Sequence, residues 1–265
     1  MTSDRPIGVF DSGVGGVSVL REIRRELPAE DLIYLADSAY TPYGDRPATV
    51  IIERSIAMVA LLEREGVKAV VVACNTATGV AVDTLRARFS LPIVAIEPAV
   101  KPAVARTRSG VVGVLATTQT LASERFSKLV DTHAGGVRVV TQPSPGLVEV
   151  VEAGELSTAA TRSLVERYVR PLLDHGADTI VLGCTHYPFL SAVIQDVAGP
   201  DVTVIDPAVA VARELRRRLQ GGGLLAPDLR IGSQRFWTTG PPAQSQTVIA
   251  QLWGTLVEVT HAPAA

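Results

Sequence analysis

Short apolar runs alternate with longer amphipathic stretches along most of the chain. Such runs are typical of buried strands, and apolar residues spaced three or four apart are typical of helices that cover a sheet. The runs predict strands at Ile7–Phe10, Leu32–Leu35, Ala69–Ala73, Ile93–Ala95, Val111–Leu115, Val137–Val140, Thr179–Leu182 and Val202–Ile205. The stretches predict helices at Val14–Leu27, Pro47–Glu65, Thr76–Phe89, Ser157–Leu173 and Val209–Leu219, then a strand near Phe236–Trp237 and a helix at Thr247–Trp253. This alternation indicates an α/β fold with mostly parallel sheets.

The chain repeats itself at an interval of about 110 residues. The segment IEPAV at 96–100 returns as IDPAV at 205–209, and the only two cysteines, Cys74 and Cys184, are 110 positions apart. The alternative to a duplication is a chance likeness between apolar runs that end in small polar residues. The constant offset favours two similar lobes, each a mostly parallel sheet flanked by helices. With crossovers at the two proline-containing segments, we expect one lobe from 1–97 plus 208–265 and a second from 98–207.

The composition narrows the class of protein. With 265 residues, 47% of them hydrophobic and 20% charged, the chain is long enough to bury a large core. A net charge of −2 suggests no electrostatic footprint for nucleic acid or an acidic membrane surface. No segment approaches the ~20 apolar residues of a membrane span, and the start of the sequence does not resemble a secretory leader. We expect a cytoplasmic protein whose cysteines are free thiols.

Each cysteine directly follows an apolar run, in VVACNTAT and VLGCTHYP. Ligands bind at the carboxyl ends of parallel strands, so two facing lobes would bring both thiols to one cleft. A carbon held between two thiols can lose a proton to one and gain a proton from the other on the opposite face, which inverts a stereocentre. One cysteine by itself is most simply an inert buried thiol. The matched pair favours an epimerase that acts on a small acid.

The residues after each cysteine suit an anionic substrate. Asn75-Thr76 and Thr185-His186 stand where helices should begin. The backbone N–H groups and the positive dipole end at such positions can hold a carboxylate and stabilise a thiolate.

His186 lies two residues from Cys184 and could protonate or orient its thiol. Asp11, Asp37 and Glu152 are candidates for the second partner of this imidazole. A hydrogen-bonded core histidine is the alternative interpretation.

The segment DSGVGG at 11–16 follows a predicted strand and opens a predicted helix. It could be a dinucleotide-binding fingerprint with Asp37 as the ribose acid. The last glycine of that fingerprint is absent, and Asp11 would place a carboxylate beside a pyrophosphate. In a site for a protonated amine the same Asp11 is useful, and Ser12 adds a hydrogen-bond donor. A nucleotide-dependent oxidoreductase and a two-lobe ligand-binding protein are the alternatives from other classes.

Four segments together resemble the glutamate racemase family: IGVFDSGVGG, DSAYTPYG, ACNTAT and GCTHYP. The resemblance spans about Ile7 to Asp206. It implies a cofactor-independent, metal-free isomerase with two pseudo-symmetric α/β lobes and its active site in the cleft between them. The implied reaction interconverts L- and D-glutamate and supplies D-glutamate for peptidoglycan. An aspartate-type racemase of the same family is the nearest alternative.

The resemblance also implies roles for individual residues. Cys74 and Cys184 match the proton donor and acceptor pair. The implied substrate-binding residues are Asp11, Ser12, Tyr43, Gly44, Asn75, Thr76, Thr117, Thr185 and His186. The implied residues that assist the thiols are Asp11, Asp37, Glu152 and His186.

Two departures from the family pattern affect this assignment. Ala116-Thr117 stands in place of Gly-Thr, and Ser144-Pro145 stands in place of Cys-Pro. The second departure leaves Glu149, one turn before Glu152, as an alternative for the assisting carboxylate. The resemblance further implies a homodimer, with DNA gyrase as a second partner by family analogy.

Overall fold

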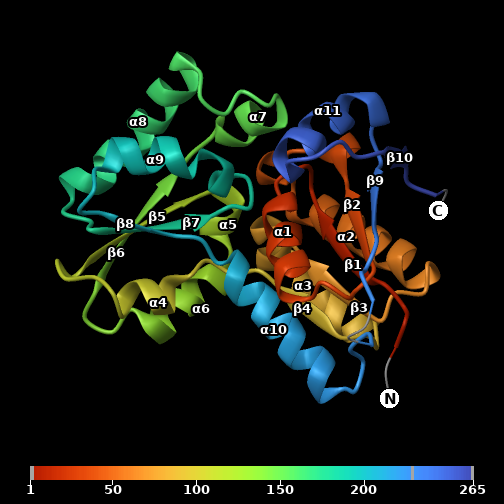
Figure 1. The fold of residues 1–265 in the computed structure, drawn as a ribbon. Helices are drawn as coiled ribbons and strands as arrows, with labels where there is room; N and C mark the ends of the chain where they lie inside the picture. The colour runs from red at the N-terminus through yellow and green to blue at the C-terminus, as the bar shows by residue number, and fades with distance from the viewer. Residues whose placement is uncertain (1–2, 228–229, 264–265) are drawn as a thin grey trace.

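The computed structural model, which describes residues 3–227 and 230–263, contains two parallel sheets flanked by helices (Figure 1). The strands of the first sheet are β1 (Ile7–Asp11), β2 (Leu32–Ala36), β3 (Ala69–Val72), β4 (Ile93–Ala95), β9 (Gln234–Thr238) and β10 (Val259–His261). Those of the second are β5 (Val111–Ala116), β6 (Arg138–Pro143), β7 (Thr179–Gly183) and β8 (Thr203–Ile205). The strand orders are β10-β9-β2-β1-β3-β4 and β6-β5-β7-β8. The predicted α/β fold class is confirmed.

The longer predicted helices are also present, with ends that differ by a few residues. They are α1 (Val17–Glu26), α2 (Ala48–Arg64), α3 (Asn75–Arg88), α8 (Ala159–Asp174), α10 (Ala208–Gly221) and α11 (Pro242–Trp253). The helices that the sequence pattern did not indicate are α4 (Val100–Val104), α5 (Thr118–Ala122), α6 (Glu124–His133), α7 (Leu147–Glu152) and α9 (Ser191–Ala198). Most of these are too short for a clear apolar period. In α6 only Phe126 is buried, which explains why its pattern was missed.

The central strands of the first sheet are covered on both faces. Every residue of β1 is buried, as expected for a parallel strand between two helical layers. Ile7 and Val9 belong to the same core cluster as residues of α1 and α10, whereas Phe10 belongs to the cluster that contains residues of α2 and α3. Successive side chains of β1 point to opposite faces of the sheet and therefore pack against the two helical layers in turn.

The chain crosses between the two sheets twice, near the two I-[E/D]-P-A-V segments (Figure 1). After the second crossover, α10 packs against α1, and β9 then pairs with β2. The C-terminal part of the chain thus returns to the first sheet. The lobe boundaries 1–97 with 208–265 and 98–207 stay a prediction, and the predicted ends at 1–2 and 264–265 lie outside the described residues.

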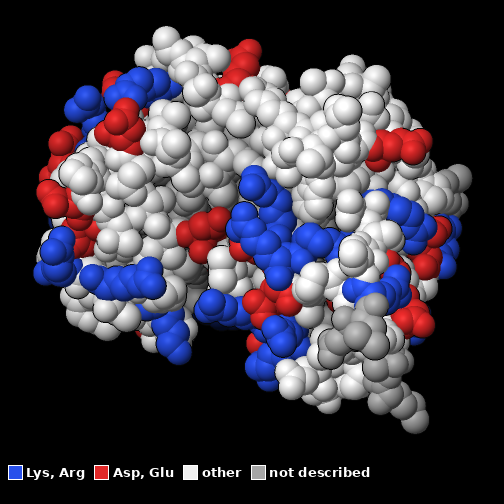
Figure 2. Space-filling view, viewed as in Figure 1, with Lys and Arg blue, Asp and Glu red and all other residues white. Residues whose placement is uncertain are grey.

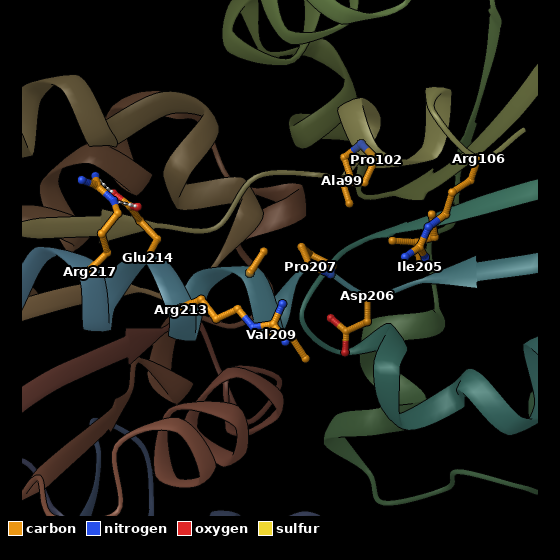
Figure 3. Close-up of a pocket in the computed structure, with 11 residues that line it drawn as sticks. Ala99, Pro102, Arg106, Ile205, Asp206, Pro207, Val209, Arg213, Glu214 and Arg217 are labelled. Carbon is orange, nitrogen blue, oxygen red and sulfur yellow. Dashed lines mark hydrogen bonds and ion pairs between the residues drawn. The ribbon is translucent and has the colours of Figure 1, made fainter.

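An open cavity of about 500 Å³ lies beside the two crossovers (Figure 3). Its lining includes Ala99 and Pro102 near the first crossover and Asp206 and Arg213 near the second. Neither cysteine lines it, so it is not where thiol chemistry can take place.

Charged side chains of both signs lie over α1 and α10 (Figure 2). Arg216 pairs with Glu26, and both Arg217 and Arg218 pair with Glu214. The run of arginines is therefore a solvated helix face with its charges paired. No helix in the described part of the chain is long and apolar enough to cross a membrane.

Candidate active site

The carboxyl ends of the central strands from both sheets meet at one small, nearly closed cavity. Asp11 ends β1, Cys74 stands just after β3, and Cys184 directly follows β7. The cavity is lined by Ser12, Pro42, Tyr43, Gly44, Cys74, Asn75, Thr76, Thr117, Val148, Cys184, Thr185 and His186. Both thiols therefore face one space. All of these residues except Pro42 and Val148 are candidates from the sequence, and the apolar side chains of these two carry no chemical signal.

Cys74 stands at the N-terminus of α3, where its sulfur accepts a hydrogen bond of 3.4 Å from the Ala77 N–H. Its thiol donates to Ser12 Oγ at 3.7 Å. Burial raises the pKa of the Cys74 thiol, the Asp11 carboxylate raises it further, and the Ala77 N–H acts in the opposite direction. The free protein therefore holds Cys74 in its protonated form at neutral pH, ready to donate a proton.

Cys184 has a different environment, because its sulfur lies 3.6 Å from Nδ1 of His186. The other ring nitrogen, Nε2, lies 2.7 Å from Glu152 Oε1. Burial opposes the charged form of His186, but the contacts with Cys184 and Glu152 raise the pKa of this imidazole well above its ordinary value. A protonated imidazole beside a cysteine can stabilise a thiolate and can exchange a proton with it.

The glycine-rich loop between β1 and α1 lies directly against this histidine and glutamate. The Val14 N–H donates to Glu152 Oε1 at 2.8 Å. A Cβ atom at Gly13 would lie 1.9 Å from Glu152 Oε1, and one at Gly15 would lie 2.3 Å from His186 Nδ1. Close backbone approach at this loop therefore accommodates side chains from the other sheet, which is a different use from the dinucleotide site considered as an alternative above.

Asp11 lies behind the cavity lining, with none of its side chain exposed. It accepts hydrogen bonds from the Gly16 N–H at 2.7 Å and from Ser12 Oγ at 3.5 Å. Burial raises the pKa of Asp11, while the neighbouring His186 lowers it. In this structure Asp11 orders the glycine-rich loop, and its contact with a substrate amine stays a prediction.

Asp37 is also fully buried, and its carboxylate binds Tyr43, Arg54 and Thr239. Within the described residues no hydrogen bond joins Asp37 to either thiol. Neither Arg54 nor Thr239 is predicted as a site residue from the sequence. Thr239 follows β9 as Asp37 follows β2, a signal that becomes visible only once the two strands are known to be neighbours.

Three threonine hydroxyls lie in a row where α3 meets α5, and those of Thr76 and Thr117 belong to residues that line the cavity. Thr76 Oγ1 lies 2.9 Å from Thr117 Oγ1, which lies 2.9 Å from Thr120 Oγ1. Beside them, the buried amide of Asn75 has no hydrogen-bond partner among the described residues. A buried amide without a partner is costly, so Asn75 is placed to bind a polar ligand.

The two candidate carboxylates on α7 differ in their contacts. Glu152 contacts His186, whereas Glu149 is exposed. Among the described residues, no group of three or more His, Cys, Asp or Glu side chains could hold a metal ion.

Comparisons with known proteins give one consistent result. A family model described as Asp/Glu/Hydantoin racemase matches residues 7–215. A glutamate racemase of Methylococcus capsulatus is 52% identical over 99% of this chain and 97% of its own. The crystal structure of a glutamate racemase isoform from Bacillus anthracis has a TM-score of 0.90 at 36% identity, with 97% of each chain covered. A glutamate racemase from Francisella tularensis, solved with D-glutamate, has a TM-score of 0.85 at 29% identity, again with 97% of each chain covered.

Proposed function

Because the chain belongs to the glutamate racemases of the Asp/Glu/hydantoin racemase family, it is an amino-acid isomerase, and we propose that it interconverts L- and D-glutamate through Cys74 and Cys184. The observation that carries this mechanism is the single cavity lined by both thiols. The two cysteines come from different sheets, so a substrate held between them presents opposite faces of its α-carbon to the two sulfurs.

The reaction needs one thiolate and one thiol. The thiolate takes the α-proton as the C–H bond breaks, and the electron pair stays on the α-carbon, stabilised by the adjacent carboxylate. The thiol on the opposite face then gives its proton to that carbon, which forms the mirror-image product and leaves the two sulfurs with exchanged protonation states. Burial favours Cys74 as the thiol, and His186 supports a thiolate at Cys184.

Substrate binding is assigned to the polar groups that line the cavity. The unpartnered amide of Asn75 and the hydroxyls of Thr76 and Thr117 lie on one side, and Ser12 and Thr185 complete the set. Gly44 packs directly against Thr117 at this cavity, because a Cβ atom at Gly44 would lie 3.1 Å from Thr117 Cβ. The N-terminus of α3 directs backbone N–H groups and a positive dipole end toward a carboxylate in this space.

The direct test is incubation of the purified protein with L-glutamate, followed by circular dichroism of the substrate. The signal should decay to zero, because enantiomers have equal free energies in water. L-Aspartate should react more slowly by about 5- to 150-fold, because one missing methylene is worth about 1–3 kcal/mol in a fitted site. Faster turnover of aspartate would favour the aspartate-type racemase instead.

Cys74→Ser and Cys184→Ser supply the matched variants for this assay. Each should abolish racemisation, because an alcohol is a far weaker acid than a thiol and is almost wholly protonated at neutral pH. Each should still bind glutamate, since the other lining groups remain.

From the family resemblance we further propose that the enzyme is cytoplasmic and supplies D-glutamate for peptidoglycan. We also propose that it forms a homodimer and that it interacts with DNA gyrase. Sedimentation of the purified protein tests the dimer. A supercoiling assay with purified gyrase, with and without the protein, tests the interaction.

A further inference from the structure

The stretch from Asp37 to Asp45 forms a wall of the site with little regular structure of its own. It contains two short 3₁₀ turns, at Ser38–Tyr40 and Tyr43–Asp45, and it supplies Pro42, Tyr43 and Gly44 to the cavity. A segment without sheet or long-helix hydrogen bonds depends on side-chain contacts to hold one conformation. The position of this wall must therefore come from specific side chains.

Asp37 supplies the central contact, because its carboxylate accepts four hydrogen bonds. Tyr43 Oη donates to Oδ2 at 2.6 Å, and Arg54 donates from Nε to Oδ2 at 2.9 Å and from Nη2 to Oδ1 at 2.8 Å. Thr239 Oγ1 donates to Oδ1 at 2.7 Å. A carboxylate has about four acceptor positions, so these donors use the full capacity of Asp37.

Two of the residues that donate to Asp37, Arg54 and Thr239, come from parts of the chain that do not line the cavity. Arg54 projects from α2, and its guanidinium also lies 3.9 Å over the ring of Tyr40. Thr239 directly follows β9, whose Thr238 is opposite Ala36 in β2, so Asp37 and Thr239 leave neighbouring strands at the same edge. Thr239 Oγ1 also accepts a hydrogen bond from the Ala39 N–H at 3.2 Å. Both residues therefore contact the wall at two points each.

We propose that Arg54 and Thr239 are positioning residues for the racemase reaction, which act through the buried Asp37 to hold Tyr43 and Gly44 in the wall of the site. The assignment rests on the proposed function. It gives Asp37 the role of orienting Tyr43, in place of the direct assistance to a thiol that the family resemblance implies. The part of the chain that returns after the second crossover is then required for a complete site.

The discriminating variants are Thr239→Val, which removes only the hydroxyl, and Tyr43→Phe. Loss of a hydrogen bond to a charged group in a buried site should raise KM for glutamate about tenfold. The value of kcat should stay within about threefold of the wild type, and both limbs of the pH profile of kcat/KM should keep their positions. Thr239→Ser should restore the wild-type KM, and Thr260→Val, at an exposed threonine of β10, is the matched control.

A second readout does not depend on turnover. Limited digestion with chymotrypsin should cleave after Tyr40 or Tyr43 several times faster in Thr239→Val and Arg54→Met than in the wild type or in Thr260→Val. Unchanged KM and unchanged cleavage in these variants would overturn the proposal. A pH profile displaced by Asp37→Asn or Thr239→Val would also overturn it, because it would show direct action on a thiol. A wild-type protein that leaves glutamate unchanged would instead refute the proposed function, and the digestion would still test the cluster.

Discussion

Glu152 Oε1 lies 2.7 Å from His186 Nε2. The same oxygen accepts a hydrogen bond from the Val14 N–H, 138 positions away in sequence, on the loop that precedes α1. One carboxylate oxygen thus contacts the imidazole beside Cys184 and the glycine-rich loop of the other sheet. One atom therefore contributes both to the raised pKa of His186 and to the contact between α7 and this loop.

Glu152→Gln should lower kcat by about 10- to 100-fold, the range expected when a hydrogen bond to a charged group is lost. Glu152 helps to raise the pKa of His186, so the substitution should lower that pKa. If the protonated imidazole is the active form, activity is lost as pH rises through the pKa of His186. The alkaline limb of kcat should then move to lower pH. Steady-state kinetics across pH measure both effects.

Glu149→Gln is the control for that experiment, because Glu149 lies one turn earlier on α7 and is exposed. It should leave kcat within about twofold of the wild type, as expected for a surface substitution. A larger loss in Glu149→Gln than in Glu152→Gln would show that the assisting carboxylate has been assigned to the wrong residue.

Gly15→Ala should reduce kcat/KM by more than tenfold, because the new Cβ atom would lie 2.3 Å from His186 Nδ1 and displace the ring from Cys184. Gly136→Ala is the matched substitution, since a Cβ atom there meets nothing within 4 Å and its φ is not in the left-handed region. Gly136→Ala should behave as the wild type. Wild-type kinetics in Gly15→Ala would contradict the close packing of His186 against the loop.

The pH profile of kcat/KM should be bell-shaped, since the reaction needs one thiolate and one thiol. Burial raises the pKa of Cys74, so its S–H form persists to higher pH than that of a free cysteine. Activity should be lost at high pH as this second thiol and the His186 imidazolium lose their protons, and at low pH as the thiolate is protonated. A profile that stays flat from pH 6 to pH 10 would argue against the pair.

Lys68→Met should destabilise the protein without changing the chemistry of the site. Lys68 Nζ lies 2.5 Å from Glu30 Oε2, and both side chains are almost wholly buried. Removing one partner of a buried ion pair costs about 3–5 kcal/mol of unfolding free energy, which urea denaturation measures. Lys68 and Cys74 lie at opposite ends of β3, so the substitution is remote from the thiol. The kcat of the folded variant should therefore stay near the wild-type value.

Lys128→Met is the control for this stability measurement. Lys128 and Glu124 form an ion pair on α6 with both side chains largely exposed, so no change in the urea midpoint is expected. An equal loss of stability in the two variants would show that burial of the Lys68 pair has no special effect.

Sequence reasoning predicted the elements whose pattern is local. The strands that precede Cys74 and Cys184 are continuous apolar runs because both of their faces are covered, and the position of each thiol just after its strand followed directly. The choice between Glu149 and Glu152 could not be made, because both lie on a six-residue helix and only contacts between the two sheets decide it. Arg54 and Thr239 were missed for the same reason, since their contacts with Asp37 depend on tertiary packing.

The two-thiol mechanism is tested most directly by racemisation of L-glutamate in D₂O, with deuterium measured at early times in both enantiomers. The α-proton leaves to one sulfur, and the proton that replaces it comes from the other, whose S–H has exchanged with solvent. Newly formed D-glutamate should carry deuterium while the remaining L-glutamate carries little. Protium in the new D-glutamate, or deuterium entering L-glutamate as fast as product forms, would show one base serving both faces and would contradict the two-thiol mechanism.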